Sequence, residues 1–279
     1  MENETRSDQK VQNSLPDRPK TDARNADDLP QLSLAAIAAF WCAAALPMPV
    51  LAFWFAPTLT ERSGLHPGVV LWCCLIAGMA WQFVLAAFFL WREAKMDGRR
   101  VTWKARIWLQ LPSEPESGRR NWRLVLWAIP LAFLTYLIED TGIADALANL
   151  MQWTQSWYAD APPPDLRHLQ DPSLQGAWWL IPVAITSCLF NYVLGEALLF
   201  HGILLPRMSG VFGKWDWFWN GVLFGSYHLI RPLTIPAIIL TAAMWAWPCT
   251  RYRSSSFALV VHAVDGFFVI ALTIAVVIG

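Results

Sequence analysis

Seven apolar runs, separated by polar segments, dominate this chain of 279 residues. A helix needs about 20 residues to cross the ~30 Å hydrocarbon core of a bilayer, and most of the runs reach that length. None of them shows the alternation typical of a strand. The sequence therefore predicts an all-α, polytopic membrane helical bundle with seven transmembrane helices, or eight if the run ending at Leu150 adds one. The predicted spans are 33–56, 67–91, 122–138, 176–204, 215–230, 233–248 and 255–278.

The composition agrees with a membrane location. Hydrophobic residues make up 56% of the chain and charged residues 15%, whereas about a quarter of a soluble domain is charged. A formal net charge of zero gives no electrostatic basis for a nucleic-acid partner, so the expected partner is the lipid bilayer. Residues 1–31 are polar, contain three prolines and lack Trp, Phe and Tyr. They predict a disordered cytoplasmic tail ahead of a helical membrane domain over 32–279.

The Lys and Arg residues between the spans predict the orientation. Nine of them lie in 92–123, and short basic connections stay on the cytoplasmic side of a membrane. We therefore expect a multi-pass protein of the plasma (inner) membrane with a cytoplasmic N-terminus and the acidic 139–175 loop outside. Residues 99–120 alternate basic and apolar side chains. Two interpretations stay open for them, an amphipathic segment on the membrane surface and a basic stop-transfer loop.

Few ionisable side chains lie well inside the predicted spans, and a carboxylate at the bilayer centre costs at least about 3 kcal/mol. At a rise of about 1.5 Å per residue from the nearest cytoplasmic basic residue, Glu196 lies roughly 16 Å deep, His228 roughly 21 Å and His262 roughly 14 Å. By the same rise, His201 lies near 9 Å. We expect Glu196, His228 and His262, from three different spans, to meet in the inner half or middle of the bilayer.

A glutamate between two histidines is suited to acid–base chemistry. Its carboxylate can hold and deprotonate a water molecule, and a histidine N–H can stabilise the oxyanion that forms when this water attacks a carbonyl group. Glu and two His are also plausible ligands of a divalent metal such as zinc. No HExxH motif is present, and a metal-free mechanism fits equally well, so the sequence commits to no cofactor.

Three motifs occur in order at these positions: EALLFHGILLPR over 196–207, FGSYH over 224–228 and HAVDG from His262. They resemble the EExxxR, FxxxH and HxxxN/D motifs of the CAAX-protease and bacteriocin-processing (CPBP, Abi) family of intramembrane proteases. The resemblance covers roughly residues 176–275 and implies a CPBP-like catalytic core there. In that family the first Glu and the FxxxH His activate water, which implies these roles for Glu196 and His228. It also implies an oxyanion role for His262 and a supporting role for Phe224.

The chain departs from the family motifs at three positions. Ala197 stands at the second Glu, His201 at the Arg and Gly266 at the Asn or Asp. We expect His201 and Asp265 to act as supporting residues in place of the missing groups.

The function implied is an intramembrane endopeptidase that cleaves a membrane-associated peptide or a lipid-modified protein. An alternative is a catalytically degenerate membrane scaffold or immunity-type protein of the same fold. A third is a small carrier in which the Glu/His cluster relays protons.

Overall fold

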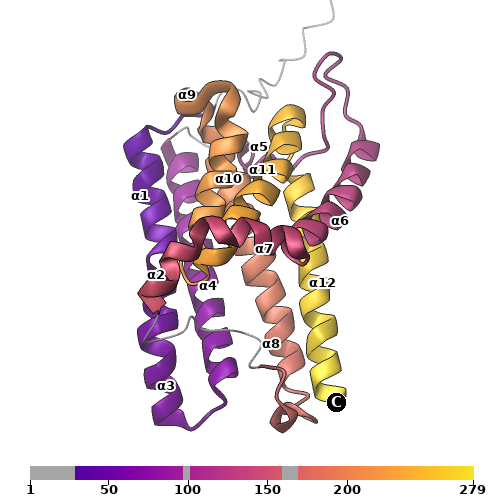
Figure 1. Ribbon diagram of the computed structural model, residues 1–279. Helices are drawn as coiled ribbons and strands as arrows, with labels where there is room; N and C mark the ends of the chain where they lie inside the picture. Colours follow the sequence, from indigo (N-terminus) through magenta and orange to yellow (C-terminus); the bar gives the residue numbers. More distant parts are fainter. Residues whose placement is uncertain (1–28, 97–100, 159–168) are drawn as a thin grey trace, which may run out of the picture.

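The computed structural model describes residues 29–96, 101–158 and 169–279. Its regular structure is helical throughout this part of the chain (Figure 1). The predicted tail over 1–31 lies outside the described residues except for its last three. The elements are α1 Leu34–Ala45, α2 Pro47–Val50, η2 Leu51–Phe55, α3 Ala56–Ser63, α4 Pro67–Met96, α5 Trp103–Arg106, η3 Trp122–Trp127, α6 Ala128–Glu139, α7 Gly142–Ala148, η4 Asn149–Tyr158, η6 Pro172–Leu174, α8 Leu180–Ser187, η7 Cys188–Leu204, η8 Leu205–Arg207, α9 Ser209–Phe212, η9 Gly213–Trp215, α10 Asp216–Ser226, η10 Pro232–Thr234, α11 Ile235–Tyr252 and α12 Ser256–Ile278.

Six helical stretches within the described residues are long and apolar enough to cross a membrane. The polytopic helical bundle predicted from the apolar runs is therefore confirmed, with about the expected number of spans. The stretches are Leu34–Ser63, Pro67–Met96, Trp122–Glu139, Leu180–Arg207, Pro232–Tyr252 and Ser256–Ile278.

The predicted span over 215–230 is the one that differs. Its helix, α10, has 11 residues, or about 16 Å at the α-helical rise, which is too short to cross the bilayer. In Figure 1, α10 descends from one end of the bundle to its middle, and α11 returns to the same end. α11 is longer, at 18 residues, and the turn between α10 and α11 lies at mid-height of the bundle.

Two glycines on α10 allow this hairpin to be tight. A Cβ atom added at Gly221 would lie 2.6 Å from the backbone nitrogen of Ala243, and one at Gly225 would lie 2.7 Å from that of Ile239. Small residues four apart are typical of close helix pairs in membranes. Because α10 and α11 pack backbone to backbone here, the position of the chain that follows Ser226 is fixed.

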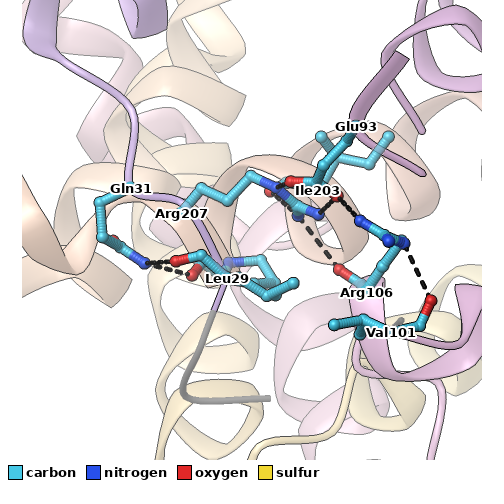
Figure 2. Close-up of polar contacts among 8 residues, drawn as sticks. Leu29, Gln31, Glu93, Val101, Arg106, Ile203 and Arg207 are labelled. Carbon is cyan, nitrogen blue, oxygen red and sulfur yellow. Dashed lines mark hydrogen bonds and ion pairs between the residues drawn. The ribbon is translucent and has the colours of Figure 1, made fainter. Parts of the chain in front are cut away.

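A buried ion-pair cluster joins three parts of the chain at the end of the bundle where α9 lies (Figure 2). Arg207 donates hydrogen bonds to both carboxylate oxygens of Glu93, at 2.9 and 2.6 Å. Arg106 donates to the same carboxylate at 2.8 Å. All three side chains are buried. The two arginines are therefore structural groups of the bundle, although Arg106 is one of the nine basic residues in 92–123 on which the predicted orientation rests.

The segment that follows α4 also packs into the bundle. Its described part, 101–121, contains the short helix α5, and the side chains of Ile107 and Trp108 belong to the main hydrophobic core. The carbonyl of Trp108 accepts a hydrogen bond from the Ser255 backbone nitrogen at 2.9 Å. The described part of this segment is therefore anchored to the bundle, and the choice between an amphipathic surface segment and a basic stop-transfer loop stays a prediction.

Residues 29–31, the described end of the predicted tail, pack against the chain around Arg207. Leu29 is buried, and the Gln31 side chain donates a hydrogen bond to the Pro206 carbonyl at 3.1 Å (Figure 2). Its amide oxygen accepts from the Gly210 backbone nitrogen at 3.0 Å. The chain entering α1 is thus tied to the end of the helix that carries Glu196.

Candidate active site

Glu196 and His201 lie on η7, which is a π-helix of 17 residues. In an α-helix, two residues five apart point about 140° away from each other. In a π-helix, the N–H of one residue bonds to the carbonyl five residues earlier, so residues five apart stack on one face. Glu196 and His201 are both buried, and both face His262 on α12, as the following distances show.

The Glu196 carboxylate lies between two partners from other elements. One oxygen accepts a hydrogen bond from the hydroxyl of Tyr227. Tyr227 is buried and is the C-cap residue of α10. The other oxygen lies 3.7 Å from Nδ1 of His262. The carboxylate is thereby held in one orientation, with one oxygen engaged by Tyr227 and the second turned towards an imidazole.

His228 follows Tyr227 in the turn at mid-height. Its Nδ1 lies 3.1 Å from the Phe224 carbonyl oxygen, and a carbonyl can only accept a hydrogen bond. Nδ1 is therefore the protonated nitrogen, and Nε2 carries the free lone pair. The ring packs against Tyr227 at 4.2 Å between centroids. Within the described residues, His228 and Glu196 form no hydrogen bond or ion pair with each other. Tyr227 contacts both of them.

His262 lies in a pocket of rings. The ring of Trp245 meets it edge to face at 4.9 Å, Phe224 lies at 5.6 Å and His201 at 6.0 Å between centroids. Neither ring nitrogen of His262 has a hydrogen-bond partner within the described part of the chain. One nitrogen of a neutral imidazole always carries a proton, so His262 has an unused N–H beside Glu196.

His201 is fully buried next to His262. Neither of its ring nitrogens has a hydrogen-bond partner among the described residues, and neither does the side-chain oxygen of Asn220. Asn220 lies close enough to interact with the His201 ring, and its amide nitrogen donates to the Phe200 carbonyl at 2.8 Å. Buried polar atoms without partners are rare in folded proteins and call for an explanation. Here they lie among the aromatic rings that surround His262.

Phe224 and Asp265, which were predicted as supporting residues, both lie next to His262. Phe224 is buried at the centre of the ring cluster, in contact with His201, His228 and His262. Asp265 has a carboxylate oxygen 3.9 Å from Nδ1 of His262 and is partly exposed.

Gly266, which stands where the family has Asn or Asp, lies at a close contact between α12 and η7. A Cβ atom there would lie 3.2 Å from Sγ of Cys188 and 3.4 Å from the Tyr192 ring. The Cys188 thiol also donates to the Gly266 carbonyl at 3.0 Å. α12 therefore approaches η7 closely at this point, and a larger side chain would require the Cys188 and Tyr192 side chains to shift.

Two residues of the site were not predicted from the sequence. Tyr227 lies inside the FxxxH motif directly before His228, and that adjacency is the only signal that it carries. Trp245 lies on α11 in a span with no ionisable side chain, and its ring nitrogen donates to the hydroxyl of Thr135 at 2.8 Å. Nothing in the sequence distinguishes it from the other tryptophans of the chain.

No group of three or more His, Cys, Asp and Glu side chains within the described residues is arranged to hold a metal ion.

The fold and the site define an integral membrane protein with several spans and a buried Glu/Tyr/His cluster at mid-height. A comparison with protein families gives a match to the model described as type II CAAX prenyl endopeptidase Rce1-like, over residues 177–268. The matched stretch contains Glu196, His228 and His262. The resemblance seen in the three motifs is thus confirmed by a family match over this region. No curated protein and no solved structure matches the chain.

Proposed function

We propose that this protein is an intramembrane endopeptidase of the CAAX-protease type, which hydrolyses a peptide bond in a membrane-associated peptide or lipid-modified protein. The observation that carries the proposal is the convergence of Glu196, His228 and His262 on one buried space within the Rce1-like region. η7, the α10–α11 turn and α12 each bring one of these residues. Because hydrocarbon supplies neither water nor charge stabilisation, hydrolysis at this depth requires such an enclosed polar space.

Glu196 is the general base in this proposal. Tyr227 occupies one carboxylate oxygen, so the second oxygen takes a proton from the attacking water. His228 orients that water by accepting a hydrogen bond at Nε2, because its Nδ1–H is committed to the Phe224 carbonyl. The hydroxide bonds to the carbonyl carbon of the substrate, and Glu196 passes its proton to the leaving amine nitrogen as the C–N bond breaks. The products are a carboxylate and an amine.

His262 is the oxyanion donor. The tetrahedral intermediate carries a negative charge on the former carbonyl oxygen, and preorganised donors aimed at such an oxygen typically account for a factor of about 100 to 1000 in rate. The unpartnered ring nitrogens of His262 and the lack of room at Gly266 support this assignment. Asp265 and His201 support the His262 ring from two sides.

The orientation proposed from the sequence places the N-terminus and the end of the bundle bearing α9 in the cytoplasm, with the protein in the plasma membrane. Exposed basic side chains at that end, such as Arg92, Lys104, Arg123 and Lys214, support it even though Arg106 and Arg207 are buried. Reporter fusions at the N-terminus and after Gly279 test the proposal. Activity of a cytoplasmic reporter at the C-terminus contradicts it.

Cleavage of fluorogenic peptides tests the function. The full-length protein is placed in lipid nanodiscs and offered a set of prenylated and acylated peptides with a fluorophore and quencher on either side of the scissile bond. We expect turnover by the wild type and a loss of at least about 100-fold in Glu196→Gln and in His228→Gln, since a general acid–base group contributes 10²–10⁴-fold. His66→Gln is the matched control, because His66 pairs with Asp171 away from the site.

Two outcomes contradict the proposal. Cleavage that persists in Glu196→Gln rules out the Glu196 mechanism. A folded wild-type protein that cleaves no member of the peptide set indicates the scaffold alternative, in which the motif departures have ended catalysis.

A further inference from the structure

A long cavity lies beside the candidate active site, between the α8–η7 helix and α12. Its volume is about 1090 Å³, at the upper end of the range for small-molecule sites of roughly 300–1000 Å³. Along α12 it is lined from Val269 to Gly279, a distance of about 15 Å at the helical rise. Figure 1 shows this half of the bundle below the α10–α11 hairpin, where α8 and α12 run side by side. The cavity is therefore elongated along the helix axes.

The walls along these helices are apolar. Leu180 on α8, Trp72 on α4, and Val269, Leu272 and Val276 on α12 line the cavity. None of these side chains offers a charge, and at most the indole of Trp72 offers a donor, which is already bonded to Ser187 at 2.9 Å. This part of the cavity suits a hydrocarbon chain.

One end of the cavity carries a single cation. Arg231 is the only Lys or Arg among the described lining residues, it is exposed, and no carboxylate of the described residues lies within ion-pair distance of it. Asp140 and Asp171 also line the cavity. Asp171 is engaged elsewhere, because hydrogen bonds from Ser173 and His66 hold the pKa of its carboxyl below the usual range. Arg231 also interacts electrostatically with the more distant carboxyl groups of Glu139 and Glu196, but its guanidinium makes no ion pair with a described residue.

We propose that this cavity binds a single-chain amphiphile, with an oxyanion head group on Arg231 and its hydrocarbon chain between α8 and α12. A guanidinium binds carboxylates and phosphates through two parallel hydrogen bonds, so both head groups share the required chemistry. The apolar side chains along α8 and α12 contact the hydrocarbon chain. Because Arg231 lies at one end of the cavity, the head group of the ligand lies at that end.

The head-group end of the cavity adjoins the Glu/His cluster. Tyr192, which lines the cavity, lies 6.2 Å from His262 between ring centroids. Arg231 follows His228 by three residues, and the Arg231 backbone nitrogen donates to the His228 carbonyl at 2.9 Å. A ligand on Arg231 is therefore held next to the site, yet its binding requires no bond cleavage. The proposal can be tested without reference to peptide hydrolysis.

Equilibrium binding of tritiated dodecanoate to the full-length protein in nanodiscs tests the proposal, with dodecyl phosphate and dodecanol as competitors. We expect saturable binding of one dodecanoate per chain, displaced by dodecyl phosphate and at least tenfold less well by dodecanol. Tighter binding of dodecyl phosphate identifies a lipid phosphate as the natural head group, and tighter binding of dodecanoate identifies a carboxylate.

Variants separate the head-group contact from the chain contact. Arg231→Gln should weaken dodecanoate binding at least tenfold without lowering the thermal stability, because Arg231 is exposed and makes no ion pair with a described residue. Leu272→Trp should weaken all three probes equally by filling the cavity. Arg251→Gln, an exposed arginine at the other end of the bundle, is the matched control and should bind as the wild type does.

Three results overturn the proposal: no saturable binding, equal binding of dodecanol and dodecanoate, or unchanged affinity in Arg231→Gln. Each leaves the proposed peptide hydrolysis intact if the wild type still cleaves peptides, so the two proposals fail independently.

Discussion

The hydroxyl of Tyr227 donates a hydrogen bond to the carboxylate of Glu196, and so links the end of α10 to the π-helix η7. The neighbouring residue, His228, is thereby brought to the same place from the same turn. Because one oxygen of the Glu196 carboxylate is bonded to Tyr227, only the other oxygen is available to accept a hydrogen bond from a water molecule. Tyr227 is therefore a positioning residue in the proposed reaction, because it acts through Glu196.

Tyr227→Phe should lower kcat for peptide cleavage by about 10- to 100-fold and leave KM within about a factor of three. The phenyl ring keeps the packing on His228 and Phe200, but the carboxylate loses its orienting hydrogen bond, which is worth about 1.5–3 kcal/mol when one partner is charged. Steady-state kinetics measure the split. Tyr252→Phe, on α11, is the control; an equal loss in both variants contradicts the specific role of Tyr227.

Gly225→Ala should reduce cleavage strongly by displacing the turn that carries His228. A methyl group at this position meets the backbone of Ile239, and overpacking of this kind costs about 1–3 kcal/mol. Thermal unfolding and cleavage are measured together. Gly142→Ala, where an added Cβ meets nothing within 4 Å, should be close to wild type in both. Wild-type cleavage by Gly225→Ala contradicts the proposed dependence on α10–α11 packing.

Glu93→Gln should destabilise the protein by about 3–5 kcal/mol, since removal of one member of a buried ion-pair group leaves the remaining charges without compensation. The side chains of Arg106 and Arg207 are both buried around Glu93, so neither arginine can move readily into water. Chemical unfolding in mild detergent measures the loss. Glu61→Gln, an exposed carboxylate on α3, should change stability by less than about 0.5 kcal/mol. A small effect at Glu93 contradicts a structural role for the cluster.

His201→Phe and His262→Phe should differ although the two rings lie 6.0 Å apart. Replacing His201 removes two buried nitrogens without partners, so stability should stay equal or rise, with less than a tenfold loss of cleavage. Replacing His262 removes the proposed oxyanion donor and should cost at least about 100-fold in kcat. Melting temperatures and kcat of both variants measure the difference. Equal losses of kcat contradict the assignment of His262 as the donor.

The sequence predicted the membrane bundle and the stretch that carries the site because these depend on local composition and on motif spacing. Apolar runs long enough to cross a bilayer have few alternative folds, which is why α4 and α12 begin and end close to the predicted limits. The order of Glu196, His228 and His262 in three separate runs was enough to expect that they meet. The depth of each residue in the bilayer, estimated from the rise of a straight α-helix, was similar for all three. This estimate requires no knowledge of how the helices pack.

Other features depend on tertiary structure and had no local signal. The π-helical register of η7 gives Glu196 and His201 one face, whereas α-helical geometry places them about 140° apart. Glu93 lies at the end of a span between basic residues, where composition indicates a solvated charge. Its burial depends on Arg106 and Arg207, which come from other parts of the chain.

The close pairing of α10 and α11 also bears on how the membrane stays sealed to ions. Polar groups of the candidate site and the cavity occupy much of the thickness on one side of the turn at His228. Gly221 and Gly225 bring the backbones of α10 and α11 into contact, and such close packing leaves little room for a hydrated ion between these two helices. A substitution that separates α10 from α11 is for this reason expected to make the membrane conductive as well as to disturb the site.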